Sequence, residues 1–114
     1  MRKDARYLDD IIEAIARIER YTVNGTQVIE QDDLIGTWVL HHLQMIGEAA
    51  RSLSQPLKRA HPEIAWRQLI DFRNVVVHQY FSVDMAIVRA VVDHDLADLK
   101  AKVEAIAQTV ERED

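Results

Sequence analysis

The segment FRNVVVHQYF, residues 72–81, contains the side chains best suited to chemistry on a phosphate. Arg73 is permanently cationic, and a guanidinium can bind a phosphate through two hydrogen bonds and stabilise charge that develops in a transition state. His78 carries an imidazole, a group that transfers protons near neutral pH. Tyr80 carries a phenol that can stack on a base or be modified. An arginine and a histidine are the minimum for cleaving RNA without a metal, with the 2′-hydroxyl as the attacking group.

The spacing of these residues restricts how they can meet. On an ideal helix Arg73 and His78 point about 140° apart, whereas Arg73 and Tyr80 are about 20° apart. The three groups converge only if the helix ends or distorts around His78, or if a second chain completes the site. Asn74 is placed to orient Arg73 or His78. The same spacing also fits a structural role, with Arg73 in a salt bridge, His78 in a helix C-terminal cap and Tyr80 half buried.

Glu48 is a further candidate because it lies within MIGEAAR, among small and apolar residues. A carboxylate in such surroundings needs a partner, and Arg73 or Arg51 can provide one. We therefore expect Glu48 to support the site. His41 and His42 are adjacent, so they point about 100° apart and cannot form a metal pair on one helix. The chain has no cysteine, and we expect neither a metal nor another cofactor.

Length and composition bound the possible function classes. The 114 residues suit one domain, residues 1–114, with 48% hydrophobic residues and only three glycines and two prolines. The start of the sequence lacks the apolar run of a signal peptide, and no segment approaches the length of a membrane span, so we expect a cytoplasmic protein. The net charge of −5 argues against binding duplex DNA, although it leaves room for a local cationic cleft.

The hydrophobic residues follow a helical period over the first half of the chain. Asp4 is a plausible N-cap of a first helix, and residues 21–31, which include Asn24-Gly25, read as a loop. A second helix is expected to begin near Asp32 or Asp33 and to run to Leu53. The buried face of the first helix is predicted to consist of Leu8, Ile11, Ile12, Ile15 and Ile18.

The second helix carries an apolar arc wider than one core requires. Such an arc predicts either the central helix of a bundle or a contact with another subunit. Gly47, with two alanines close behind it, would allow another helix to approach closely. Trp38, like Trp66, is expected in the core or at an interface. One stripe contains Leu34, Trp38, His41, Met45 and Ala49, and the adjacent stripe contains Ile35, Val39, Ile46, Ala50 and Leu53.

The second half of the chain predicts a linker and two more helices. Pro56 and Pro62 are expected to interrupt helix within residues 54–64. A third helix is predicted over 64–77, with the valines at 75–77 locking its end into the core or an interface. Ser82 is a good N-cap for a long fourth helix that continues to about Val110. The prediction is an all-α domain, a four-helix up-and-down bundle.

Several segments together resemble the HepT-like proteins, a branch of the HEPN superfamily. RNVVVHQY matches the R-x4-H-x-Y signature of that family. MIGEAAR, PEIAWRQLIDFRN and YFSVD also look like the family, in the same order and spacing. The resemblance covers roughly residues 4 to 110, and the loop at 21–31 is its least characteristic part.

The resemblance implies a homodimeric all-α bundle in which signature residues of both subunits face a shared cleft. It implies the toxin of a type VII toxin–antitoxin pair, a metal-independent endoribonuclease whose partner is a minimal nucleotidyltransferase of the MntA type. Arg73 and His78 would then be the catalytic residues for an RNA substrate, with Asn74 and Glu48 in support. Tyr80 would accept AMP from the partner, and the added phosphate would block the cationic subsite.

A second interpretation belongs to a different class. The chain could be a non-catalytic, dimeric module that binds nucleotide or phosphate through Arg73, as a partner or substrate of a nucleotidyltransferase. The acidic net charge and the lack of an evident basic track for RNA favour this module. The intact pair of Arg73 and His78 favours the ribonuclease.

Overall fold

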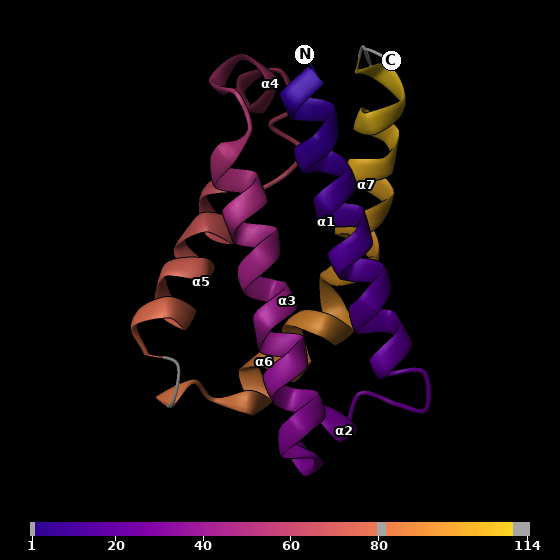
Figure 1. Cartoon of the computed structure of the whole chain (residues 1–114), viewed down its shortest axis with the longest axis vertical. Helices are drawn as coiled ribbons and strands as arrows, with labels where there is room; N and C mark the ends of the chain where they lie inside the picture. Colours follow the sequence, from indigo (N-terminus) through magenta and orange to yellow (C-terminus); the bar gives the residue numbers. More distant parts are fainter. Residues whose placement is uncertain (1, 80–81, 111–114) are drawn as a thin grey trace.

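The chain runs up and down along one axis, as the computed structural model in Figure 1 shows. The structure describes residues 2–79 and 82–110, and in this part of the chain the regular secondary structure consists of helices, without strands. The predicted all-α class is therefore confirmed. The helices are α1 (Arg2–Tyr21), α2 (Val28–Gln31), α3 (Asp33–Ser52), α4 (Gln55–Ala60), α5 (Trp66–His78), α6 (Met85–His94) and α7 (Leu96–Thr109).

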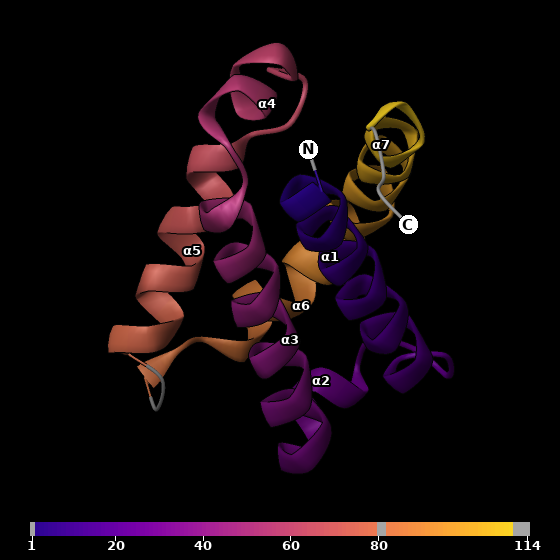
Figure 2. The same ribbon diagram turned by 45° about the horizontal axis from the view of Figure 1, so that its top comes forward.

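Helix α3 is the centre of the packing. It lies between α1 and α5, while α7 packs along α1 and the short α2 contacts both α3 and α6 (Figures 1 and 2). Burying each large apolar side chain in this core contributes roughly 1.5–3 kcal/mol. The predicted face of α1 is confirmed, with Ile12 only partly buried. The largest fully buried side chains are Leu8, Ile11, Ile15, Ile18, Ile29, Val39, Ile46, Val76, Val88 and Val103.

Asp4 is not an N-cap, and the prediction for the start of α1 was wrong. The helix begins at Arg2, so Asp4 lies in its first turn on the inward face and is only 4% exposed. Its carboxylate accepts hydrogen bonds from the backbone N–H of Ser54 at 2.9 Å and from the Ser54 hydroxyl at 2.6 Å. Asp4 therefore ties the start of α1 to the junction of α3 and α4, a contact between residues that are distant in the sequence.

The predicted linker at 54–64 contains the short helix α4. Ser54 caps it by accepting a hydrogen bond from the Leu57 N–H at 3.3 Å. Pro56 does not interrupt helix as predicted, because it lies in the first turn of α4, where a missing N–H costs nothing. The Lys58 ammonium donates to the carbonyl oxygens of Ala50 at 3.1 Å and Arg51 at 3.3 Å. Burial lowers the pKa of Lys58, against the opposing effect of the Asp4 carboxylate.

The fourth helix differs from its prediction in two ways. Asp84, not Ser82, is the N-cap, and its carboxylate accepts from the Ala86 N–H at 2.9 Å. The predicted continuous helix is divided at Asp95 into α6 and α7. The division changes the direction of the chain, so that α6 packs against α2 and α7 packs along α1 (Figure 1).

The predicted loop at 21–31 is a turn followed by the helix α2. Gly25 has a φ of 121°, a left-handed conformation that glycine adopts without strain. Ile29 of α2 is buried in the core. The N-cap of α3 is Asp32, which accepts hydrogen bonds from the N–H groups of Leu34 and Ile35, so the predicted start of the second helix is confirmed.

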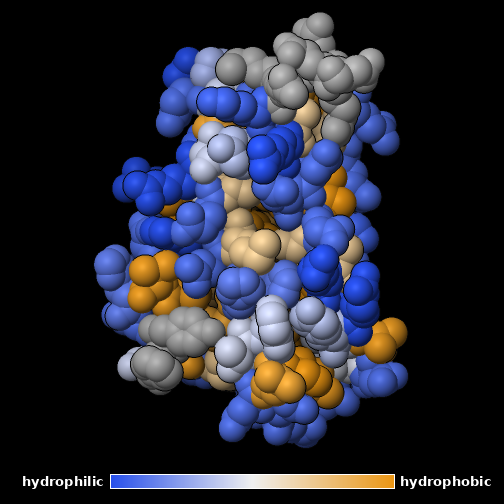
Figure 3. Space-filling view, in the orientation of Figure 1, coloured by the Kyte–Doolittle hydropathy of each residue, from blue (hydrophilic) through white to orange (hydrophobic). Residues whose placement is uncertain are grey.

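The two apolar stripes of α3 differ in burial, and in the stripe that begins at Leu34 only Ala49 is buried. Val39, Ile46, Ala50 and Leu53 are buried, whereas Leu34 is 67%, Trp38 46% and Met45 40% exposed. In Figure 3, hydrophobic residues show between hydrophilic ones on the face of the molecule where α3 runs. Trp66, in contrast, is buried as predicted, and its indole N–H donates to the His61 carbonyl at 3.0 Å. None of the described helices is long and apolar enough to cross a lipid bilayer.

Candidate functional site

A glycine brings α3 and α5 together at the candidate site. A Cβ atom at Gly47 would collide with Cβ of Arg73 and would lie 3.0 Å from the Leu69 carbonyl oxygen. No larger residue fits at this crossing without moving one helix. The close approach predicted at Gly47 is therefore confirmed, and it lays the Arg73 side chain along the surface of α3.

Arg73 is held by two neighbours. Its Nε donates to Oε1 of Glu48 at 2.7 Å, and its Nη2 donates to the same oxygen. Its Nη1 donates to Oδ1 of Asn74 at 3.0 Å. The Arg73 side chain is 17% exposed, whereas that of Glu48 is 48% exposed. Of the two arginines considered as partners of Glu48, the structure gives Arg73.

The guanidinium keeps part of its binding capacity. Arginine carries five N–H donors, and the bonds to Glu48 and Asn74 engage three of them. One N–H remains on each terminal nitrogen. Those two groups can donate to the oxygens of a phosphate while Glu48 and Asn74 fix the plane of the guanidinium.

His78 lies apart from this group. It is the last residue of α5, it is exposed, and the Gln79 N–H closes the helix on the Val75 carbonyl at 2.8 Å. Within the described part of the chain, no hydrogen bond or ion pair joins His78 to Arg73, Asn74 or Glu48. Since α5 stays helical from Arg73 to His78, the two side chains point about 140° apart.

One chain therefore gathers Arg73, Asn74 and Glu48 and leaves His78 outside the group. The predicted end of the helix near His78 is present, but it comes too late to turn His78 toward Arg73. The remaining candidate, Tyr80, lies outside the residues that the structure describes.

The valines between Arg73 and His78 divide between core and surface. Val76 is completely buried and anchors the end of α5, as expected. Val75 is 46% and Val77 38% exposed, so they are not locked into the core of this chain. Their exposure leaves apolar surface uncovered between Arg73 and His78 on α5.

The other histidines have structural surroundings. His42 is buried, with Nδ1 2.6 Å from the Trp38 carbonyl oxygen, and its ring contacts Tyr21 and Trp38. His61 bonds to Glu63 at 2.9 Å. The pKa of Glu63 is lowered by a hydrogen bond from its own backbone and by the bond with His61. Among the described residues, no cluster of three or more His, Asp or Glu side chains could hold a metal ion.

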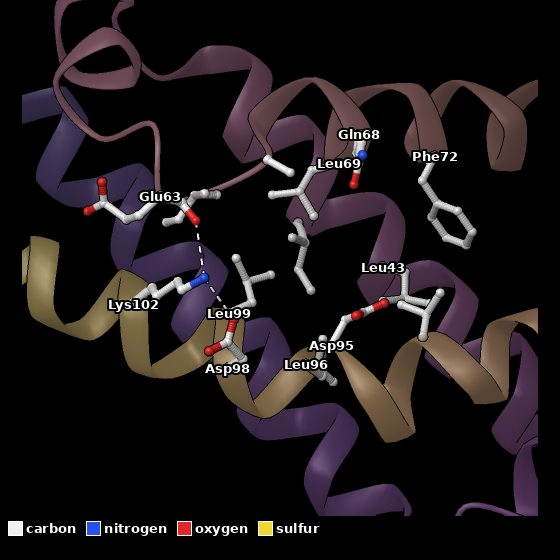
Figure 4. Close-up of a pocket in the computed structure, with 14 residues that line it drawn as sticks. Leu43, Glu63, Gln68, Leu69, Phe72, Asp95, Leu96, Asp98, Leu99 and Lys102 are labelled. Atoms are coloured by element: carbon white, nitrogen blue, oxygen red, sulfur yellow. Dashed lines mark hydrogen bonds and ion pairs between the residues drawn. The ribbon is translucent and has the colours of Figure 1, made fainter.

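A cavity of about 380 Å³ lies on another side of α5 (Figure 4). Phe72 lines it, whereas Arg73 and His78 do not. Lys102 closes one edge by donating to the Glu63 carbonyl at 3.1 Å and pairing with Asp98 at 2.9 Å. Its remaining lining is mainly apolar and includes Leu43, Ile46, Leu69, Val91, Leu96 and Leu99. Such surroundings do not suit a phosphate, whereas the two remaining N–H donors of Arg73 do.

One face of α5 contains a residue that the sequence reasoning missed. Arg67, Asp71, Asn74 and His78 are spaced by four, three and four residues, which places them on one stripe of the helix. Arg67 lies 3.8 Å from Asp71, and their side chains are 90% and 61% exposed. The sequence already contained this spacing of three and four residues, which places Arg67 on the same face of α5 as His78.

Known proteins match the chain over most of its length. A family model described as ribonuclease HepT-like matches residues 11–106. The probable ribonuclease HepT of Thermococcus cleftensis is 36% identical over 104 residues, covering 88% of the chain and 92% of that protein. A provisionally named RNase of Methanocaldococcus jannaschii is 26% identical over 102 residues, covering 88% and 93%.

A second protein of the same archaeon matches only in part. It is named as a gamma-glutamylcyclotransferase and provisional RNase, and it is 30% identical over 118 residues. The match covers 98% of the chain but 51% of that protein. No solved structure matches the chain significantly.

Proposed function

The chain belongs to the ribonuclease HepT-like family, and from this premise we propose that it is a metal-independent endoribonuclease. The observation that carries the proposal is the fixed guanidinium of Arg73, which keeps two free donors beside Glu48 and Asn74. His78 supplies an exposed imidazole on the same helix. This pair meets the two needs of RNA cleavage, transfer of a proton and stabilisation of charge on the phosphate.

The proposed reaction is a transfer of the phosphate within the RNA. His78 accepts the proton of a 2′-hydroxyl, whose oxygen forms a bond to the adjacent phosphorus. The bond from phosphorus to the 5′-oxygen breaks, and that oxygen takes up a proton from water or an imidazolium. Arg73 stabilises the charge that builds on the other phosphate oxygens. The products are a 2′,3′-cyclic phosphate and a free 5′-hydroxyl.

We further propose that two copies of the chain form the working enzyme. Within one chain Arg73 and His78 point to different sides of α5, so a second subunit is needed to gather all the groups in one cleft. The exposed stripe of α3 (Leu34, Trp38 and Met45) offers an apolar surface for this contact. Exposed apolar surface of this kind marks interaction sites, and twofold dimers are the commonest assembly.

Control by a partner completes the proposal. In this scheme the protein is the toxin of a toxin–antitoxin pair, and a nucleotidyltransferase of the MntA type adds AMP to Tyr80. The signature places Tyr80 two residues beyond His78. In the proposed shared cleft, the AMP phosphate would compete with the RNA phosphate for Arg73 and repel the substrate.

Cleavage of RNA in excess chelator tests the enzymatic proposal. The unmodified protein is expected to cut RNA, and Arg73→Ala and His78→Ala are each expected to lower the rate by about 100-fold or more. Arg20→Ala, which removes an exposed arginine of α1, is the control and is expected to cut normally. If the unmodified protein does not cut RNA, the alternative of a phosphate-binding module holds. The net charge of −5 and the separation of Arg73 from His78 favour that alternative.

The role of Tyr80 is tested separately by intact mass. Incubation with the partner transferase, ATP and magnesium is expected to add the mass of one or more AMP groups to the wild type and none to Tyr80→Phe. An equal gain in Tyr80→Phe would exclude Tyr80 as the acceptor.

A further inference from the structure

One segment of this acidic protein is basic. Residues 51–67 contain Arg51, Lys58, Arg59 and Arg67 against a single carboxylate, Glu63, whereas the whole chain has a net charge of −5. The segment comprises the end of α3, all of α4 and the start of α5. Figures 1 and 2 both show α4 at the top of the molecule, above the end of α3 and above the start of α5. The four cations of this segment therefore lie at one end of the molecule, where the buried carboxylate of Asp4 is bonded to Ser54.

Three of these cations are available to a ligand. Arg51 and Arg59 are exposed and have no ion pair within the described residues. The side chain of Arg67 is 90% exposed and lies 3.8 Å from Asp71, a surface pair that contributes little binding energy. Lys58 differs, because its ammonium is engaged by the carbonyl groups at the end of α3.

Glu63, which carries the single carboxylate of the segment, contacts residues other than these arginines. Glu63 bonds to His61 and lies at the edge of the cavity near Lys102 (Figure 4). That cavity lies between α5 and α7, on a different side of α5 from Arg73. Glu63 therefore bonds to His61 rather than to an arginine of this segment.

The basic end is continuous with the candidate site. Arg51 follows Glu48 by three residues on α3, one turn nearer to α4. Arg67 lies on the stripe of α5 that contains Asn74 and His78, about 9 Å before Arg73 along the helix axis. Since α3 and α5 cross at Gly47 and Arg73, Arg51 extends the positive surface from Arg73 toward α4. Arg67 extends it from the side of Asn74 and His78, about 120° from Arg73 around α5.

We propose that Arg51, Arg59 and Arg67 form an arginine track that binds the sugar-phosphate backbone of single-stranded RNA next to the cleaved phosphate. The proposal rests on the ribonuclease function and assigns the part of the substrate that lies toward α4. Exposed arginines suit a flexible anionic chain, because each can neutralise one phosphate without reading the base. A duplex would need a broader basic surface than this acidic chain offers.

The test uses the His78→Ala protein, which keeps the track but is expected not to cut the probe. The triple variant Arg51→Gln, Arg59→Gln, Arg67→Gln is made in this background. Its matched control removes three exposed arginines from one face of α1, with Arg6→Gln, Arg17→Gln and Arg20→Gln. Circular dichroism shows whether all three proteins fold. The Kd for a fluorescent single-stranded RNA is then measured at several salt concentrations.

The expected result is a difference in salt dependence. Each lost phosphate contact lowers the slope of log Kd against log salt by about 0.7 for a single strand, so the track variant should lose about 2 units of slope. The control should keep the slope of the parent protein. Equal slopes in the track variant and the control would overturn the proposal and would leave RNA cleavage by the wild type untouched.

Two further outcomes show whether the RNA track or the ribonuclease function is wrong. If the track variant binds RNA like the control but no longer associates with the nucleotidyltransferase, the arginines serve a protein partner and the RNA track is wrong. If the unmodified protein does not cut RNA in chelator, the ribonuclease function fails, whatever slopes are measured. The binding assay therefore tests the arginine track, and the cleavage assay tests the ribonuclease function.

Discussion

The contact between Arg73 and Glu48 joins residues that are 25 positions apart in the sequence. Both Nε and Nη2 of the arginine meet one carboxylate oxygen, which sets the orientation of the guanidinium plane. A flexible arginine would lose entropy on binding a phosphate, and this loss is smaller when the side chain is already fixed. We therefore assign Glu48 a positioning role in the proposed reaction.

Replacing Glu48 is expected to slow catalysis without abolishing it. Glu48→Gln keeps the shape of the side chain but weakens its hold on Arg73, so kcat should fall by about 10- to 100-fold. The measurement is the rate of RNA cleavage in chelator at saturating RNA. KM should change much less than kcat, because the cation that attracts the RNA is still present.

A matched variant separates positioning from a general loss of charge. Glu13→Gln removes the carboxylate from another ion pair with an arginine, on the exposed face of α1, where Arg17 lies 3.0 Å away. It is expected to cut RNA at the wild-type rate. Equal rates for Glu48→Gln and the wild type would contradict the positioning role.

The sequence proposed which residues form the candidate site, but it did not predict their contacts. The position of Glu48 among small residues indicated that it needed a partner, and the partner was one of two arginines. Helical spacing could not choose between Arg73 and Arg51, because the choice depends on how closely α5 approaches α3. That distance is set by Gly47, whose missing side chain admits the backbone and Cβ of the neighbouring helix.

At the scale of the helix pair, Gly47→Ala tests whether Gly47 sets the distance between α3 and α5. In an open helix, alanine is more stable than glycine by about 1 kcal/mol. At Gly47 the added Cβ would strike Arg73 and crowd the Leu69 carbonyl, and overpacking of this kind costs about 1–3 kcal/mol. Because the steric cost outweighs the gain in propensity, urea denaturation should show a less stable protein, with slower RNA cleavage.

An exposed position of the same helix provides the comparison. Thr37→Ala replaces a residue of α3 that is exposed to solvent, so only helix propensity should act there. It is expected to leave stability unchanged or slightly raised. A gain in stability for Gly47→Ala as large as that for Thr37→Ala would show that α3 and α5 separate without cost.

A second prediction at the scale of the helices concerns the contact of Asp4 with Ser54. Asp4→Ala leaves the Ser54 N–H and hydroxyl without their acceptor, and the expected loss of stability is about 1–3 kcal/mol. Ser54→Ala should also destabilise the protein, and the double variant should lose less than the two single variants combined. Additive losses in urea denaturation would mean that the two residues act independently.

The local sequence predicted where the helices lie better than it predicted where they end and how they are connected. The period of Leu8, Ile11, Ile15 and Ile18 identified α1 because a buried helix face depends on nearby residues alone. The capping role of Asp4 failed because its partner, Ser54, is 50 residues away. The division of the last helix at Asp95 has no proline or glycine to mark it, and it follows from the different neighbours of α6 and α7.

At the scale of the whole molecule, the exposed stripe of α3 is unlike the rest of the surface. Leu34, Trp38 and Met45 follow one another at helical spacing, whereas single exposed residues such as Ile87 are ordinary in a monomer. The wide apolar arc of the sequence predicted two outcomes for α3, a central helix or a subunit contact. The central position of α3 accounts for one stripe, and the proposed dimer would account for the other.

Introducing a charge into this stripe is expected to separate the subunits. Leu34→Glu places a carboxylate in the first turn of α3, where the helix dipole favours it, so the folded monomer should survive. Burying that charge at an apolar dimer contact is costly, and light scattering after gel filtration should show a shift from dimer to monomer. RNA cleavage should fall with the dimer, because in the proposed dimer Arg73 and His78 meet across the two chains. Ile87→Glu, at a residue of α6 that is 57% exposed, adds the same charge away from the stripe and should stay dimeric and active. A Leu34→Glu monomer that cuts RNA as fast as the Ile87→Glu protein would show that one chain gathers its own catalytic groups, and the dimeric site would have to be abandoned.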